Sequence, residues 1–301
     1  MKKGYLYIAL TAFIFSTAEI ATKFVANQIN PIQLTFIRFL VGGLFLLPFA
    51  IMEIRRRHIR LTVKDLLTFA MLGAVGITVS MPLFQSAVVY AKAGTVAVIF
   101  SANTIFVAFF AVVILKEKFT AVAAAAIALG LIGILCLLNP LAASPDTKGI
   151  LLALASALFF ALYSVLAGGK VRQFGGFITN SISFIAGSLL LLPLMAFTNT
   201  PVIQGITLQN LPIVLYICLI VTGLGYMLYF TAMKDTSAIE TSSVFFIKPA
   251  LAPVLSLIIL GEAIRLNTLL GIAFIVAGAF LLFWRKARVA SREARLGNPT
   301  H

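Results

Sequence analysis

The sequence contains few of the residues on which most catalytic and metal sites depend. Its 301 residues include two cysteines, Cys136 and Cys218, and two histidines, His58 and His301. Both cysteines lie in apolar runs, which predicts small buried side chains and neither a disulfide framework nor a metal site. The sequence also lacks a P-loop, an H-E-x-x-H motif and a G-x-S-x-G motif. We therefore expect no direct ATP coupling, no enzyme activity and no cofactor.

Charged residues are scarce as well. They make up 11% of the chain, whereas hydrophobic residues make up 61% and the mean hydropathy is +1.09. A soluble domain could not bury so much apolar surface, so we expect an all-α integral membrane protein. Long apolar runs exclude a transmembrane β-barrel, whose strands alternate in hydropathy. Ten runs approach the length that spans a bilayer: residues 5–26, 34–52, 66–87, 93–115, 121–138, 149–169, 177–197, 211–231, 240–260 and 267–284.

Acidic residues are the rarer charge, nine against 23 basic residues, for a net charge of +14. Such a surplus can indicate a nucleic-acid partner, but in a membrane protein it indicates cytoplasmic loops. With the N-terminus in the cytoplasm, 17 basic residues lie on that side, four lie on the other, and Arg38 and Lys248 lie within runs. We therefore expect a multi-pass membrane protein with both termini cytoplasmic, a lipid bilayer around it and no nucleic-acid partner. The basic tail is expected to lie on the anionic inner leaflet or to be disordered.

The two halves of the sequence resemble each other at an offset of 145 residues. The matches that carry this comparison include Leu46-Leu47-Pro48 with Leu191-Leu192-Pro193, Gly133 with Gly278, and Glu117 with Glu262. Each half holds five runs, and because five is odd the second half enters the membrane from the opposite side. The chain is thus predicted to comprise a first repeat (1–145), a second repeat (146–284) and the tail (285–301). Inverted repeats permit alternating access, which predicts a secondary transporter.

Several stretches match one known family. They are N-P-I-Q-L-T-F-I-R-F-L at 30–40, L-K-E-K at 115–118, L-G-E at 260–262 and the ninth run with Pro249 and Pro253. The sequence resembles the drug/metabolite transporter superfamily, specifically its EamA-type ten-helix carriers. The resemblance implies ten helices in two inverted five-helix units around a central cavity. It also implies a carrier of amino acids, amines, nucleotide-linked metabolites or drugs, located in the bacterial inner membrane and in many cases directed outward. Many first-half copies in that family carry a proline in the fourth helix, where this chain has Ser101-Ala102-Asn103-Thr104.

Lys248 and Glu19 are the principal candidates for substrate binding or ion coupling. If the ninth helix begins near residue 240, Lys248 lies about 12 Å along its axis. A cation at that depth is costly and usually faces a polar interior. The alternative is a lysine neutralised by a structural partner. Glu19 is either an interior carboxylate for an amine or a proton, or the partner of Lys23 near the outer surface.

The repeat separates structural from functional candidates. Asn103 occupies the place of Lys248 in the first half, so this position breaks the symmetry and is assigned to the site. Pro249 and Pro253 are expected to kink the ninth helix and to free carbonyl groups. Glu117 and Glu262 recur at helix ends, which favours a structural role.

The remaining candidates are polar or aromatic. Arg38 is assigned a structural or gating role, as a bridge to loop carbonyls or a helix end. Tyr163, Tyr226 and Tyr229 each carry a phenol that needs a partner inside a span, and they either line a pocket or pack. Gln85 is a further polar contact. Small residues such as Gly73 and Gly133 are expected to permit close helix crossings.

Two transport functions follow from these candidates. The first is export of a small zwitterionic metabolite such as an amino acid, with Lys248 facing the carboxylate and Glu19 facing the amine or a coupling proton. The alternative is a carrier of organic cations or hydrophobic drugs that uses Glu19 and the tyrosines. A membrane-embedded enzyme or scaffold is a third class, disfavoured by the inverted repeat.

Overall fold

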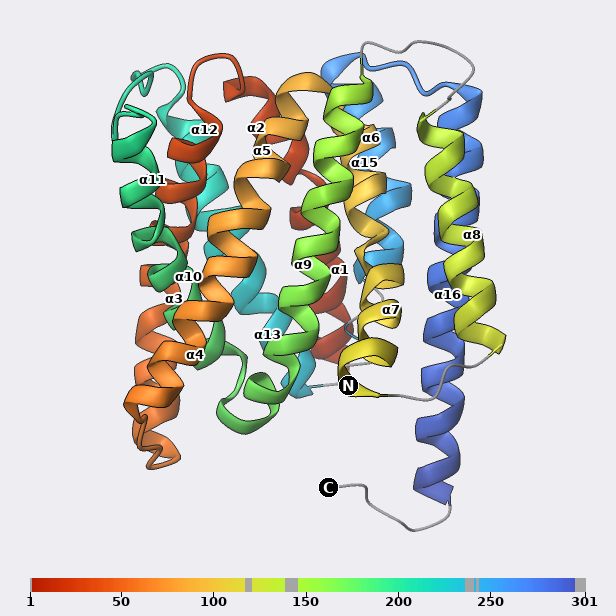
Figure 1. The fold of residues 1–301 in the computed structure, drawn as a ribbon, viewed down its shortest axis with the longest axis horizontal. Coiled ribbons are helices and arrows are strands. Elements are labelled where there is room, and N and C mark those ends of the chain that lie inside the picture. The colour runs from red at the N-terminus through yellow and green to blue at the C-terminus, as the bar shows by residue number, and fades with distance from the viewer. Residues whose placement is uncertain (1, 117–120, 139–145, 236–240, 242–243, 296–301) are drawn as a thin grey trace.

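A computed structural model describes residues 2–116, 121–138, 146–235, 241 and 244–295, and these residues form a helical bundle (Figure 1). The first half contains α1 (Lys2–Ser16), α2 (Ala18–Val25), α3 (Pro31–Arg56), α4 (Val63–Gly73), η1 (Ala74–Val79), α5 (Ser80–Tyr90), α6 (Ala93–Ser101), α7 (Asn103–Leu115) and α8 (Ala121–Leu138). The second half contains α9 (Thr147–Phe174), α10 (Gly176–Leu189), α11 (Leu191–Phe197), α12 (Leu211–Leu215), η2 (Tyr216–Leu224), α13 (Gly225–Asp235), α15 (Val244–Leu260) and α16 (Leu266–Arg295).

These elements join into the expected spans. Within the described residues, seven helical stretches, several of which join two or more of these elements, are long and apolar enough to cross a membrane. Three shorter apolar helices, Ala124–Leu137, Ile247–Leu260 and Leu266–Leu281, occupy the positions predicted for the fifth, ninth and tenth spans. The first turn of α1 and the last turns of α16 lie at the same end of the bundle (Figure 1). The predicted all-helical, ten-span architecture is confirmed.

The inverted repeat is visible in matching local structures. Helix α4 begins with a capping box in which Asp65 N donates to Thr62 Oγ1 and Thr62 N donates to Asp65 Oδ2. Just before α12, 145 residues later, Asn210 N donates to Thr207 Oγ1 and Thr207 N donates to Asn210 Oδ1. The reciprocal bonds satisfy backbone groups that a helix start leaves unpaired. The same capping arrangement therefore lies at the start of the third span at one end of the bundle and at the start of the eighth span at the other end.

Both of these spans then widen into a π-helix. Segment η1 covers Ala74–Val79, and η2 covers Tyr216–Leu224, which contains the equivalent positions. Each segment contains a threonine whose hydroxyl donates to a backbone carbonyl: Thr78 donates to Gly187 O of α10 at 2.8 Å, and Thr222 donates to Ile217 O, five residues earlier, at 2.9 Å. Segments of π-helix are rare and occur preferentially at functional sites.

The two halves cross each other at these segments. Helix α3 packs against η2, and its counterpart α10 packs against η1. A Cβ placed on Gly42 of α3 would lie 2.5 Å from Thr222 Cγ2, and one placed on Gly187 of α10 would lie 2.5 Å from Gly73 O. Such close approaches need glycine, so the predicted small-residue crossing at Gly73 is confirmed. The predicted crossing at Gly133 is confirmed too, because a Cβ there would lie 3.0 Å from Gly271 O in α16. Helices α8 and α16 form a neighbouring pair at one side of the bundle (Figure 1).

Helix continuity differs from the sequence prediction in the first, fourth and tenth spans. The first span breaks at Thr17, between α1 and α2, and the fourth breaks at Ala102, between α6 and α7. Helix α15 continues through both Pro249 and Pro253. The basic tail is not disordered from residue 285 onward, because α16 continues to Arg295.

Candidate functional site

The first and ninth spans meet at a buried ion pair. Lys248 Nζ lies 2.6 Å from Glu19 Oε1, and the two side chains are 7% and 0% exposed. Glu19 lies in the first turn of α2, directly after the break at Thr17. Lys248 lies in the first turns of α15, beside Pro249. The sequence predicted both residues as site candidates, and the structure brings one from each half into contact.

Aromatic rings surround the ammonium group. Lys248 Nζ lies 5.2 Å from the ring centroid of Phe100 and 5.9 Å from that of Phe84. The two rings contact each other edge to face with centroids 4.8 Å apart. A cation gains energy near the faces of such rings, particularly where water is excluded. Sequence reasoning missed both phenylalanines, because nothing in the pattern distinguishes them from the 26 phenylalanines of the chain.

The polar groups next to the ion pair are incompletely satisfied. Glu19 Oε1 contacts Lys248 Nζ, whereas Glu19 Oε2 has no hydrogen-bond partner among the described residues. Gln85, on α5 next to Phe84, is 1% exposed, and neither atom of its amide has a described partner. The hydroxyl of Thr22 is also buried and unpaired within the described chain. Since a buried ion pair offsets its desolvation only when its remaining lone pairs are bonded, this arrangement is costly as a purely structural one.

Lys23 does not neutralise Glu19. Its ammonium group donates instead to the carbonyl oxygens of Val88 and Ala91, each at 2.7 Å. These carbonyls end α5, where a cation also interacts favourably with the helix dipole. The predicted alternative, a Glu19–Lys23 pair, is therefore wrong, and Lys23 anchors the end of a neighbouring helix.

Arg38 reaches across to the other half. Its Nε donates to Thr222 Oγ1 of η2 at 2.7 Å, and its guanidinium lies 5.1 Å from the ring centroid of Phe39. Arg38 is 6% exposed, and its Nη1 has no hydrogen-bond partner among the described residues. The predicted bridge exists, but it ends on a side-chain hydroxyl in a π-helix, where the expectation was loop carbonyls or a helix terminus. Thr222 was missed because its role depends on the packing of α3 against η2.

The three tyrosines differ in their surroundings. Tyr163 donates from its phenol to Asn180 Oδ1 at 2.6 Å, and Asn180 Nδ2 donates to Gly176 O. Tyr226 and Tyr229 lie in α13, where both rings contact Phe15 of α1, with centroids 5.2 Å and 6.3 Å away. Phe15 lies two residues before the break at Thr17, so Tyr226 and Tyr229 belong to an aromatic cluster beside that break. Tyr163 belongs instead to a polar contact between α9 and α10.

Glu262 stabilises the start of a helix. Its carboxylate accepts hydrogen bonds from the backbone nitrogens of Ala93 at 3.1 Å and Gly94 at 3.3 Å, and from the hydroxyl of Ser256. It thereby supplies acceptors at the N-terminus of α6, as a structural residue would. Glu117, its predicted counterpart, lies outside the described residues. Asn103 is buried at the first position of α7, next to the break at Ala102.

A separate cleft lies at the end of the bundle where α5, α6, α15 and α16 begin or end. It is small and does not include Glu19 or Lys248. Its lining combines Lys92, Arg265 and Asp146 with uncharged polar side chains. In the described part of the chain, no three His, Cys, Asp or Glu side chains gather as a metal site would require.

Comparison with known proteins identifies the family. A model of the EamA-like transporter family matches residues 2–139 and again residues 147–284. The chain belongs to the EamA-like transporter family. It is 41% identical to an uncharacterized transporter of Clostridium kluyveri over 289 residues, which are 93% of each chain. It is 26% identical to the uncharacterized inner membrane transporter YicL of Salmonella typhimurium, over 96% of this chain and 99% of the relative. The resemblance drawn from the sequence motifs is confirmed.

A solved crystal structure shows the same fold. Its similarity has a TM-score of 0.64 at 18% sequence identity and covers 96% of this chain and 99% of the solved one. The family is one of transporters and not of enzymes, and the ten-span bundle is that of a multi-pass membrane protein.

Proposed function

We propose that this EamA transporter is a secondary-active exporter of a small metabolite, an amino acid or related zwitterion, in the bacterial inner membrane. The observation that carries the proposal is the closed Glu19–Lys248 ion pair, which joins a helix of the first half to a helix of the second. Intramembrane charges are costly and usually mark the path of a substrate or an ion. The 17-to-4 distribution of basic residues supports cytoplasmic termini.

The geometry supports an exchange of partners. The ion pair must separate before a substrate can bind between its members. Glu19 and Lys248 then each need a new oppositely charged partner, because both lie in a low-dielectric interior. An amino acid supplies both, a carboxylate for Lys248 and an amine for Glu19. A proton on Glu19 is the other way to compensate that charge, which would couple transport to a proton gradient. Because each half contributes one charge, movement of the halves in alternating access changes the distance between them.

Transport in proteoliposomes tests this function. Glu19→Gln and Lys248→Met each remove one charge, and we expect transport of amino acids to fall at least tenfold in both. Lys64→Gln is the matched control, because Lys64 is an exposed cation on α4 and its loss should leave transport unchanged. Wild-type rates in both site variants would overturn the proposal.

A second candidate is a carrier of organic cations or hydrophobic drugs. It is favoured by the aromatic cluster near Glu19, in which Phe15 contacts Tyr226 and Tyr229, and Tyr229 contacts Phe245 at 6.0 Å. Such rings suit a cation. This function predicts transport of tetraethylammonium that survives Lys248→Met and is lost in Glu19→Gln.

A further inference from the structure

The charges in the interior of the bundle do not balance. Among the described residues, three charged side chains are buried, Glu19, Arg38 and Lys248. Lys248 already contacts Glu19 at 2.6 Å, so Arg38 has no counter-ion in contact with it in the described chain. Helix α2, which carries Glu19, packs against η2, and η2 carries Thr222, the hydrogen-bond partner of Arg38, so Arg38 belongs to the same interior region. A buried cation without a partner is costly, and proteins normally pair it.

The guanidinium of Arg38 is held in a fixed orientation with one nitrogen unused. Its Nε is bonded to Thr222, whose own hydroxyl donates to Ile217 O, and the group lies near the ring of Phe39. Nη1 is buried and has no described hydrogen-bond partner. A guanidinium is planar and offers its donors in a rigid fork that matches a carboxylate. An arginine held this way is preorganised for an anion that is not part of the chain.

We propose that the carboxylate of the substrate binds to Arg38 together with Lys248, and that this carboxylate is the group the site requires. The inference rests on the proposed function, since it concerns the same interior site. When a carboxylate binds there, two anions face two cations and the interior is neutral. A substrate amine is not needed for this balance, so we expect the amine to be accepted beside Glu19 without being required. Gln85, whose amide atoms have no hydrogen-bond partner among the described residues, is available to bond further polar groups of the ligand.

Sets of three related ligands test this requirement. Each set contains an amino acid, its carboxamide and its deaminated acid, for example leucine, leucinamide and 4-methylpentanoate, with matching sets for alanine and phenylalanine. The readout is the thermal unfolding midpoint of the purified full-length protein as a function of ligand concentration. For wild-type protein we expect the deaminated acid and the amino acid of at least one set to raise the midpoint, and the amide of that set to have no effect.

Variants at Arg38 connect that preference to the guanidinium. Arg38→Gln should weaken the apparent affinity for the acid about ten- to a hundredfold, the range for one charged hydrogen bond. Arg38→Lys keeps the charge but loses the forked donor geometry, so its affinity for the acid should lie between those of the wild type and Arg38→Gln. If Arg38→Gln fails to fold, Arg38→Lys provides the test. Lys64→Gln, which removes an exposed cation, should respond as wild type does.

Three results would overturn the inference. The first is that the amides stabilise the wild type as well as the acids do. The second is that no acid in any set shifts the unfolding midpoint. The third is that the acids bind Arg38→Gln and Arg38→Lys with wild-type affinity. Its failure is distinguishable from failure of the proposed function. If Glu19→Gln and Lys248→Met abolish transport while the Arg38 variants keep wild-type acid binding, the transport site stands and only the role of Arg38 is wrong.

Discussion

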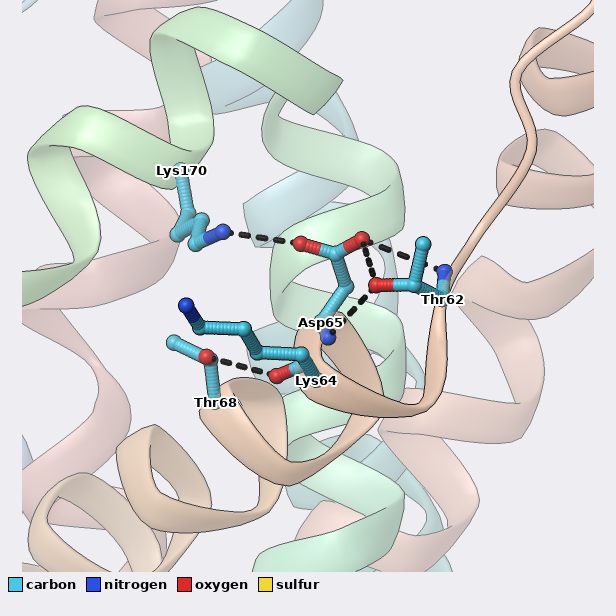
Figure 2. A network of polar contacts seen from close by, with 5 residues as sticks. All are labelled: Thr62, Lys64, Asp65, Thr68 and Lys170. Atoms are coloured by element: carbon cyan, nitrogen blue, oxygen red, sulfur yellow. Dashed lines mark hydrogen bonds and ion pairs between the residues drawn. The ribbon is translucent and has the colours of Figure 1, made fainter.

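Thr62 and Asp65 exchange reciprocal backbone-to-side-chain hydrogen bonds at the start of α4. Thr207 and Asn210 exchange the equivalent two bonds just before α12, at the opposite end of the bundle (Figure 1). The neighbours of these pairs differ. Figure 2 shows Asp65 Oδ1 paired with Lys170 of α9 at 2.9 Å, whereas Asn210 Nδ2 donates to Gln28 Oε1 at 2.6 Å. The capping hydrogen bonds are thus present in both halves, whereas among the described residues the ion pair is present only beside the first-half cap.

The same contrast holds in the interior. The crossings of α3 with η2 and of α10 with η1 use the equivalent glycines Gly42 and Gly187. Lys248 and Asn103 also occupy equivalent positions, but only Lys248 carries a charge and contacts Glu19. Alternating access needs two halves that can exchange shapes, and a ligand needs a site that has one orientation. The symmetric features therefore suit the motion, and the asymmetric ones suit recognition.

Removal of the interior charge should have the largest effect on stability. Lys248→Met leaves Glu19 buried and unpaired, which should cost about 3–5 kcal/mol in the free energy of unfolding. Asn103→Ala, at the equivalent position of the first half, leaves no unpaired charge and should cost less. The measurement is thermal unfolding in detergent.

The double variant Glu19→Gln/Lys248→Met is the decisive control for that loss. It removes both charges, so it should recover most of the stability lost in Lys248→Met while transport remains abolished. A double variant as unstable as the single one would show that the lysine acts through packing alone.

The glycine crossings should come next. A Cβ at Gly187 meets the backbone oxygen of Gly73, which cannot rotate away, and a Cβ at Gly42 meets the side chain of Thr222. Overpacking of this kind typically costs about 1–3 kcal/mol, so Gly187→Ala should destabilise more than Gly42→Ala. Gly168→Ala is the matched control, because nothing lies within 4 Å of a Cβ there. Equal stability of all three variants would contradict the proposed tight crossings.

Sequence alone predicted the spans and the repeat because hydropathy and repeated residues report directly on burial and symmetry. It also selected Glu19 and Lys248, since a charge in an apolar run is conspicuous. It could not predict which carboxylate Lys248 contacts, because that depends on how α2 and α15 pack. The equivalent π-helices were missed for a related reason: an extra residue in a helical turn leaves no mark on an apolar pattern. The sequence correctly predicted that Arg38 bridges to another element, but it predicted the wrong acceptor. The acceptor is Thr222, whose position depends on how η2 packs against α3.

Glu262 should have a moderate effect. It bonds the backbone nitrogens of Ala93 and Gly94 at the start of α6. Glu262→Ala should cost about 1 kcal/mol, as loss of a helix cap does, and Glu262→Gln should cost less because one acceptor oxygen remains. Unfolding midpoints of the two variants provide the measurement. A larger loss in Glu262→Gln than in Glu262→Ala would show that the carboxylate is not acting as a cap.

The smallest effects on stability should come from the contacts at the two ends of the bundle. The effects at the two ends should differ in how they depend on salt. Lys170→Met removes a partly exposed ion pair with Asp65, and salt screens such pairs. The fall in unfolding midpoint should therefore be visible at low ionic strength and should fade in 0.5 M sodium chloride. Gln28→Met removes an uncharged hydrogen bond to Asn210, so its small effect should be the same at both salt concentrations. Equal salt dependence in the two variants would mean that the ends differ in sequence but not in the kind of interaction that stabilises them.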